Sequence, residues 1–252
     1  MEELNWCIDY LISYNHLTNL KYTYNFNTFR ALMNITFPNN LSDEYYNKQD
    51  HVLKELLSSK KVIDANNLKY VNNIAIYKGD ITLIKCDAIV NACNEKLLGC
   101  FQPLHNCIDN AIHSFAGLEV RRDLMEVMKK QNHNEENGKC KVTSAYNLPS
   151  TYIFHTVGPI IEEIITKKDE QDLANCYRSC LSKAIELNIK TIVFPCISTG
   201  IYGFDKKRAS QIAYTIVSDF LKINKNIKVI FNVFTNEDYH VYLKTLGDKY
   251  DY

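Results

Sequence analysis

The stretch TIVFPCISTGIYGFDKKRASQIAYTIVSDFL, residues 191–221, decides the fold of this chain. Residues 191–196 form a short apolar run typical of a buried strand, and residues 209–221 repeat apolar side chains at helical spacing. Between them lies a loop that contains small residues and two glycines. A strand that passes through a short loop into a helix is the unit from which α/β folds are built.

The same alternation continues on both sides of this stretch. Further strands are expected at residues 74–77, 88–91, 152–157 and 229–234, and further helices at residues 108 to about 129, 172–187 and 237–246. Strands that alternate with helices predict a layered α/β fold with a largely parallel central sheet. Ligands of such sheets bind at the carboxyl ends of the strands, so the loops after the strands are the candidate site.

The residues before position 70 follow a different pattern. Residues 4–65 consist of helical segments and their connections, in which Ser42, three residues before Tyr45, marks a helix start and FPNN at 37–40 marks a loop. No group of residues with a catalytic pattern occurs there. We expect an N-terminal helical extension, residues 1–70, that packs on a main domain of residues 71–252.

The composition limits which binding partners and which cellular compartment are expected. The 252 residues carry 29 basic and 29 acidic side chains, so nothing favours bulk nucleic-acid or anionic-membrane binding. The sequence starts acidic and its first residues hold no long apolar run, so we expect no secretory signal and no membrane span. Nine cysteines in such a chain favour a reducing, cytoplasmic location, and Cys86, Cys176 and Cys180 are expected to be buried as small apolar side chains.

Two of the loops that follow expected strands carry polar side chains. Asp80, just after Gly79, can accept hydrogen bonds from an exocyclic amine such as that of adenine; the alternative is a turn that Asp80 caps. Asn91 and Asn94 end the next expected strand and can hold hydroxyls, including those of a ribose. The alternative for these two residues is an Asx turn.

The third loop is ISTGIYGF, residues 197–204. Its small residues and glycines let the backbone approach a phosphate and point N–H groups at it, and the helix that follows adds a positive end. No lysine follows the glycine as in a P-loop, so this is not a Walker A site. The alternative is an ordinary turn from strand to helix.

Residues 99–117, GCFQPLHNCIDNAIHSFAG, carry the residues best suited to chemistry. Cys100, His105 and Cys107 are soft metal ligands at close spacing, and thiolate with imidazole selects zinc. Three protein ligands with an open position fit a catalytic or substrate-binding zinc, whereas Cys93 or Cys140 as a fourth ligand would make the zinc structural. The alternative without metal is a loop with two buried thiols and a surface histidine.

Asp109 and His113 lie four residues apart in the same segment. On a helix that starts near Cys107 they share one face, where the carboxylate can orient or charge the imidazole for acid–base work. The alternative is that Asp109 satisfies the helix N-terminus while His113 is a core histidine.

With these pieces in this order, the chain resembles a macrodomain, the α/β module that binds ADP-ribose. The resemblance covers about residues 71–252 and rests on GDIT (79–82), DAIVNACN (87–94), DNAIHSFAG (109–117), YIFHTVGP (152–159) and CISTGIYGF (196–204). It implies a three-layer α/β/α fold with a mixed, largely parallel sheet. GCFQPLHNCID (99–109) is similar to the zinc-containing subgroup, which hydrolyses mono-ADP-ribose from proteins, and residues 30–50 are similar to that subgroup's helical extension.

The resemblance also implies roles for single residues. Asp80 and the Ile81 amide would hold the adenine, and Phe234 would pack against its ring. Asn91 and Asn94 would face the distal ribose, the sugar attached to the target protein, and Asn94 is counted with the catalytic residues. The other implied groups are Phe204 beside the distal ribose, the diphosphate-binding amides of Ser198, Thr199, Gly200, Ile201 and Tyr202, the zinc ligands Cys100, His105 and Cys107, and the catalytic pair Asp109 and His113.

The chain departs from the family pattern at two places. Many hydrolytic macrodomains carry a run of glycines where this chain has LLGCF (97–101), so the catalytic geometry need not be shared. The second loop reads NACN where NAAN is common, and Cys93 there is a candidate for a further metal ligand.

The expected function is zinc-dependent hydrolysis of mono-ADP-ribose from a modified protein. The resemblance implies that the linkage is to an acidic side chain and that a sirtuin-like transferase writes the mark. One alternative is a reader that binds ADP-ribosylated partners without cleaving them, but a reader needs neither the metal ligands nor Asp109. The other alternative is a hydrolase of small ADP-ribose derivatives such as an acetylated ester.

Overall fold

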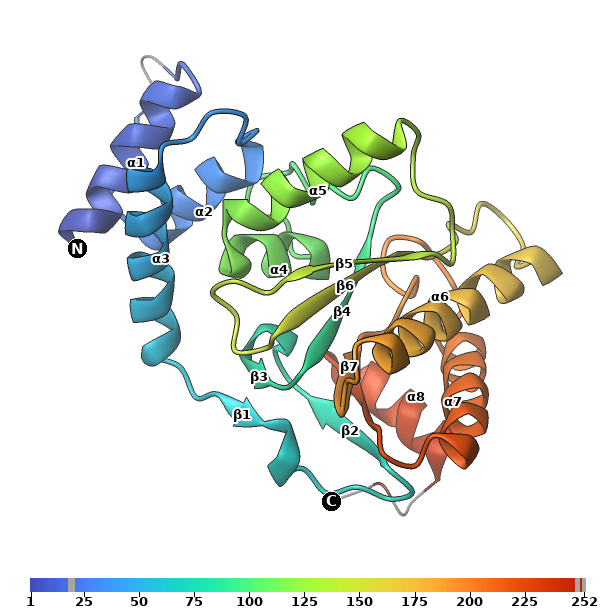
Figure 1. Ribbon diagram of the computed structural model, residues 1–252. Helices are drawn as coiled ribbons and strands as arrows, with labels where there is room; N and C mark the ends of the chain where they lie inside the picture. The colour runs from blue at the N-terminus through green and yellow to red at the C-terminus, as the bar shows by residue number, and fades with distance from the viewer. Residues whose placement is uncertain (18–20, 248–249, 251–252) are drawn as a thin grey trace.

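A six-stranded sheet forms the centre of the computed structural model, which describes residues 1–17, 21–247 and 250 (Figure 1). The strands lie in the order β2-β8-β7-β4-β6-β5, and all neighbours are parallel except β5 and β6. The strands are β2 (Ile74–Lys78), β4 (Ala88–Cys93), β5 (Cys140–Ser144), β6 (Tyr152–Val157), β7 (Thr191–Phe194) and β8 (Lys228–Val233). A separate parallel pair joins β1 (Ile63–Asp64) to β3 (Ile84–Lys85).

Helices cover both faces of the sheet. They are α1 (Glu2–Tyr14), α2 (Phe26–Ile35), α3 (Asp43–Ser58), α4 (Ile108–Ala116), α5 (Leu118–Gln131), α6 (Lys167–Glu186), α7 (Lys206–Ile223) and α8 (Asn236–Leu246), with short 3₁₀ turns η1 (Ala65–Asn67) and η2 (Ile81–Leu83). Alternate residues of each strand enter different cores, because successive side chains of a strand point to opposite faces. Ile74 and Ile76 pack with α6, α7 and α8, whereas Ala75 packs with α4 and α5. The expected three-layer α/β/α fold with a mixed, mostly parallel sheet is confirmed.

Helix α6 illustrates why the sequence folds this way. Thr166 caps it through a reciprocal pair of hydrogen bonds with Asp169, which satisfies amides that no helical carbonyl reaches. Its apolar stripe, which includes Cys176 and Cys180, is buried against the sheet. The burial expected for these two cysteines is confirmed, whereas Cys86 is only half-buried.

Two sequence predictions differ from the structure. The helix expected from 108 to about 129 is two helices, because Gly117, with a φ of 107°, ends α4 and starts α5. A side chain is strained at that φ, which explains the glycine. Strand β5 was not predicted, because its sequence CKVTS is a largely half-buried edge strand without an apolar run.

Helices α1, α2 and α3 form the N-terminal extension and lie beside α4 and α5 (Figure 1). Ser42 caps α3 by accepting a hydrogen bond from the Tyr45 amide, as its sequence predicted. The extension has its own apolar core, to which Leu118 of α5 also belongs. The boundary between residues 1–70 and 71–252 stays an interpretation, since the two parts share this core.

Within the described part of the chain, none of the helices combines the length and the apolar character that crossing a bilayer requires.

Candidate functional site

The carboxyl ends of the parallel strands bring the expected site loops to one edge of the sheet. Cys93, the last residue of β4, lies opposite Val157, the last residue of β6, and Lys78 of β2 lies opposite Val233 of β8. Ligands of parallel sheets bind at this edge. The loops after β2, β4, β7 and β8 are therefore described in turn.

Asp80 caps the turn that follows β2. Its Oδ1 accepts hydrogen bonds from the Thr82 amide at 2.9 Å and the Thr82 hydroxyl at 2.6 Å. The side-chain amide of Asn232 holds the preceding turn by donating to the carbonyl oxygens of Tyr77 and Gly79, at 3.2 and 3.0 Å. The capped turn expected as the alternative is thus present. Binding of adenine by Asp80 stays a prediction.

Two residues near Asp80 are expected to contact adenine, and only one of them is exposed. Phe234, directly after β8, leaves 67% of its surface exposed. The Ile81 side chain is buried in the core, whereas its amide donates to no acceptor within the described residues. The Phe234 ring is therefore accessible, and the Ile81 amide has no acceptor of its own, at the end of β2 and β8.

Asn91 is completely buried at the end of β4, opposite His155 of β6. Its Nδ2 donates to Asp109 Oδ1 at 2.8 Å and lies 3.3 Å from His155 Nδ1. Burial lowers the pKa of His155 to about 3, so this imidazole is neutral and can accept the Asn91 hydrogen at Nδ1. His155 Nε2 lies 2.9 Å from the Thr143 hydroxyl. Asn91 Oδ1 is also buried, and it has no partner in the described part of the chain.

Asn94 forms the Asx turn that was the alternative to ribose binding. Its Oδ1 accepts from the Lys96 amide at 3.0 Å, and its Nδ2 donates to the Gly99 carbonyl oxygen at 3.2 Å. Asn94 therefore shapes the start of the loop that carries Cys100, and its catalytic role stays a prediction.

Asp109 and His113 meet on α4 as expected. Asp109 Oδ1 lies 3.5 Å from His113 Nε2, and both side chains are buried. Burial raises the pKa of Asp109 to about 6, against the lowering effects of the Asn91 hydrogen bond and of Arg121. A carboxylate with this pKa is mostly ionised at neutral pH and still able to take a proton.

His113 does not have the charged imidazole that a simple acid–base pair would use. Burial, followed by the charge of Arg121 and the neighbouring His155, lowers its pKa well below the usual range. Neither ring nitrogen has a well-aligned hydrogen-bond partner in the residues that the structure describes. A Cβ on Gly99 would lie 2.9 Å from His113 Cγ, so the imidazole supports the loop above it. Its catalytic role stays a prediction.

Cys100, His105 and Cys107 form one cluster. Their ligand atoms all lie within 4.8 Å of one another, and Cys100 Sγ is 3.5 Å from His105 Nδ1. Zinc bonds of about 2.3 Å to sulfur and about 2.1 Å to nitrogen at a tetrahedral angle separate the two ligand atoms by about 3.6 Å, so the spacing of Cys100 and His105 fits zinc. Among the described residues, neither Cys93 nor Cys140 belongs to this cluster.

Cys107 also connects the cluster to Asp109. Its Sγ caps α4 by accepting a hydrogen bond from the Asn110 amide at 3.4 Å. Asp109 follows two residues later, in the first turn of the same helix. The candidate metal ligands and the carboxylate with the raised pKa are therefore neighbours.

The loop after β7 presents backbone amides. The amides of Ser198, Gly200, Ile201 and Tyr202 donate to no acceptor within the described residues, whereas the Thr199 amide reaches the Cys196 carbonyl oxygen at 3.4 Å. A Cβ on Gly200 would meet nothing within 4 Å, so the loop has open space above it. Asp205 caps α7 by accepting a hydrogen bond from the Arg208 amide. Binding of a diphosphate by the loop amides stays a prediction.

The two aromatic residues of this loop lie differently. Tyr202 follows β7, and its hydroxyl lies 3.5 Å from the carbonyl oxygen of Cys93 at the end of β4. Phe204 is only 2% exposed and packs in the core shared with α6, α7 and α8. Contact of Phe204 with a ribose stays a prediction.

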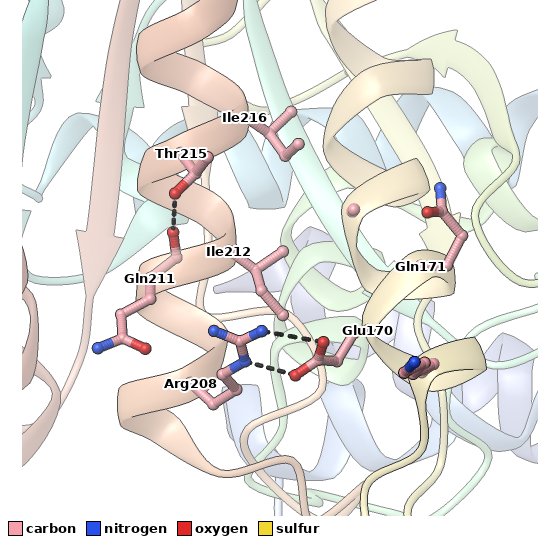
Figure 2. Close-up of a pocket in the computed structure, with 9 residues that line it drawn as sticks. Glu170, Gln171, Arg208, Gln211, Ile212, Thr215 and Ile216 are labelled. Carbon is pink, nitrogen blue, oxygen red and sulfur yellow. Dashed lines mark hydrogen bonds and ion pairs between the residues drawn. The ribbon is translucent and has the colours of Figure 1, made fainter.

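A groove of about 350 Å³ lies between α6 and α7 and is lined by residues of these two helices alone (Figure 2). Glu170 pairs with both Nε and Nη2 of Arg208 there, the second contact at 2.9 Å. The groove contains none of the expected site residues.

Comparison with known proteins decides the family. The Macro domain family matches residues 90–213. A protein-ADP-ribose hydrolase of Staphylococcus aureus is 46% identical over 218 residues, which are 85% of this chain and 82% of the relative. This chain belongs to the Macro domain family.

Other macrodomain relatives agree with this assignment. A protein-ADP-ribose hydrolase of Treponema medium is 43% identical and covers 86% of both chains. The Trypanosoma brucei macrodomain in complex with ADP-ribose is 28% identical with a TM-score of 0.66, over 86% of this chain and 95% of its own. The expectations of a macrodomain fold and of an enzyme are confirmed.

Sequence reasoning missed several residues that shape this macrodomain's site. Asn232 fixes the turn before Asp80, and His155 orients Asn91. Arg30, Asn34 and Arg121 hold the loop of residues 98–107, as described below. The histidine within the motif YIFHTVGP was a usable signal, since a polar residue in an apolar strand needs a partner.

Proposed function

We propose that this chain is a zinc-dependent hydrolase that removes mono-ADP-ribose from acidic side chains of modified proteins. The observation that carries the proposal is the position of the Cys100–His105–Cys107 cluster at the start of α4, next to Asp109. The hydrolase names of the relatives support the reaction class. The zinc dependence and the acidic linkage are proposed here in addition to what those names state.

Different groups of the chain would bind different parts of the substrate. Asp80, the Ile81 amide and the Phe234 ring would hold the adenine. The amides of the loop after β7 would hold the diphosphate, which needs no basic side chain because backbone N–H groups bind anions. Asn91 Oδ1, the buried acceptor without a partner, would receive a hydroxyl of the distal ribose. Together these contacts would fix the sugar so that attack on it is effectively intramolecular.

The reaction centre would lie between Asp109 and the cluster. A zinc ion, when bound by Cys100, His105 and Cys107, supplies a Lewis acid that can orient ribose hydroxyls and lower the pKa of a water molecule. Asp109 would take the proton of a water molecule that attacks C1 of the distal ribose, since its pKa of about 6 suits a general base near neutral pH. The bond from C1 to the modified side chain would break, and that side chain would leave as a carboxylate. Asn91 would hold the Asp109 carboxylate in place through its 2.8 Å hydrogen bond.

The test is release of free ADP-ribose from a protein modified on Asp or Glu. Cys107→Ser is the informative variant, because serine still caps α4 but removes the thiolate ligand. We expect both metal removal and Cys107→Ser to lower release at least about 100-fold while ADP-ribose still binds. Zinc added back should restore the stripped wild type and leave the variant inactive.

Other outcomes would select other functions. Release that survives both treatments would contradict a role of zinc in the reaction. Tight ADP-ribose binding without release would favour a reader. Faster cleavage of an acetylated ADP-ribose ester than of the modified protein would favour a small-molecule hydrolase. A transferase of the sirtuin type that modifies acidic side chains is the partner enzyme that the proposal implies.

A further inference from the structure

The loop of residues 98–107 makes polar contacts with helix α2 of the N-terminal extension as well as with α4 and α5. We propose that helix α2 holds this loop in the conformation that places Cys100, His105 and Cys107 together, with Arg30 and Asn34 as positioning residues. The inference rests on the proposed zinc site and assigns a role to the extension.

Asn34 holds the loop next to His105. Its side chain is 1% exposed, its Oδ1 accepts from the Leu104 amide at 3.0 Å, and its Nδ2 donates to the Ser114 hydroxyl at 2.9 Å. Leu104 has a φ of 58°, an uncommon backbone conformation for a residue with a side chain. Such conformations persist where the surrounding contacts determine them. The Asn34 hydrogen bond is the contact that stabilises this conformation of Leu104, directly before the candidate ligand His105.

Arg30 holds the same part of the loop from the preceding turn of α2. Its Nη2 donates to Asn110 Oδ1 at 2.6 Å and to the His105 carbonyl oxygen at 3.4 Å. Asn110 in turn donates through Nδ2 to the Gln102 carbonyl oxygen at 2.9 Å, and its amide donates to Cys107 Sγ. Arg30 therefore acts on the backbone around His105 and, through Asn110, on the sulfur of Cys107.

The other end of the loop is fixed through Arg121 of α5. This buried guanidinium donates to the Leu98 carbonyl oxygen at 2.7 Å and to the carbonyl oxygens of Met33 and Thr36, at 2.8 and 2.6 Å, at the end of α2. It also lies 4.3 Å from the centre of the Phe101 ring. Cys100 is thus flanked by two residues, Leu98 and Phe101, that Arg121 connects to the end of α2.

Phe37, just after α2, completes this contact by stacking on Phe101 with ring centres 4.6 Å apart. Helix α2 and the residues after it therefore contact the loop directly at Phe101, Leu104 and His105. They reach Leu98 only through Arg121. A metal site preformed in this way loses less conformational entropy when it binds its ion, and groups that orient ligands typically change metal affinity 10- to 100-fold.

The experiment measures zinc affinity by competition with a chromogenic chelator. We expect Asn34→Leu and Arg30→Met each to weaken zinc binding about 10- to 100-fold. Asn34→Asp, which keeps an acceptor for the Leu104 amide, should recover most of the loss. ADP-ribose binding, measured by calorimetry, should stay within about threefold of the wild type, because the diphosphate loop has none of these contacts.

Gln49→Leu is the matched control. Gln49 of α3 is also buried between the extension and the main domain, where it bonds the Leu118 amide at 2.9 Å and Glu119 at 2.8 Å, but it does not contact the loop. This variant should lower the melting temperature without changing zinc affinity. If Asn34→Leu fails to fold, Arg30→Lys provides the milder test, because lysine keeps the charge but loses the planar fork.

Unchanged zinc affinity in the folded Arg30 and Asn34 variants would overturn the proposal. A wild type that binds no zinc would instead refute the metal site. In that case amide hydrogen exchange over residues 98–107 decides the positioning role by itself. Exchange there should be faster in Asn34→Leu than in Gln49→Leu, and equal exchange in the two variants would overturn the positioning role.

Discussion

The Asp109 carboxylate shows how one residue combines burial with function. It is 5% exposed and has one partner of full hydrogen-bond strength, the Asn91 amide. Arg121 also favours its charged form from a distance, yet burial prevails and raises its pKa. A charged group that is kept from water destabilises the fold, as active-site residues often do.

This conflict predicts a pH-dependent effect of Asp109→Asn on stability. The pKa of Asp109 rises from 3.8 to about 6 on folding, so ionisation of this group opposes folding above about pH 6 and has no effect below about pH 4. We expect the variant to raise the free energy of unfolding by roughly 1–3 kcal/mol at pH 8 and much less at pH 4. Urea unfolding at the two pH values measures this.

Asp219→Asn is the control, because it removes the same charge from an exposed pair with Lys222. A gain from Asp109→Asn that is equal at both pH values would show that the carboxylate is not the source of the effect.

At the scale of elements, the loop after β6 supports the loop after β7. The Ile161 amide donates to the Tyr202 carbonyl oxygen at 2.8 Å. A Cβ on Gly158 would lie 2.1 Å from the Ser198 Oγ, so glycine is needed where the two loops approach each other. Ser198 itself has a φ of 63° in this packing.

Gly158→Ala should therefore weaken ADP-ribose binding, because the added methyl group displaces the backbone around Ser198. We expect at least about a tenfold increase in the dissociation constant, as for the loss of one or two hydrogen bonds to a charged group. Titration calorimetry with ADP-ribose measures it. The double variant Gly158→Ala with Ser198→Gly should recover part of the affinity, since glycine removes Oγ and suits the positive φ. The contact of the new methyl group with Ile197 Cγ2, at 2.8 Å, remains in the double variant. No loss in the single variant would mean that the loop amides do not bind the diphosphate.

At the scale of the whole molecule, the extension and the main domain share buried polar contacts. Gln49 bonds residues at the start of α5, and Arg121 bonds the end of α2. Breaking either contact leaves buried groups unpaired, at a cost of about 1–3 kcal/mol each. The two parts should therefore unfold together.

Cooperative unfolding can be measured because Trp6, in α1, is the one tryptophan of the chain. Its fluorescence reports the extension, whereas far-UV circular dichroism reports all the helices. We expect the two signals to give the same urea midpoint. A lower midpoint from fluorescence would show that the extension unfolds first and that its contacts with α5 are weak.

The sequence predicts the fold well where apolar periodicity is strong. The strands and helices after residue 70 lie close to their expected positions, because each buries a continuous apolar face. Strand β5 has no such face, and a pattern search cannot detect pairing that depends on β6. The break at Gly117 depends on a backbone angle that no apolar period encodes.

The candidate site was predictable only in part, for the same reason. Residues at strand ends could be placed together because parallel strands share one edge. The contacts of Arg30 with Asn110 and of Asn34 with Leu104 join positions 80 and 70 residues apart, which no local pattern specifies. His113 lies buried beneath Gly99, as the alternative of a core histidine expected, and this burial is the main cause of its lowered pKa.

The order of the strands also has a consequence for synthesis. Strand β2 pairs with β8, whereas β4, β5 and β6 pair with one another and α2 packs on α4. A chain that leaves the ribosome from its N-terminus can complete the second group of contacts early, but β2 must wait until β8, which begins at Lys228, has emerged. The loop of residues 98–107 can thus be assembled on the nascent chain well before the corner beside Asp80 is completed.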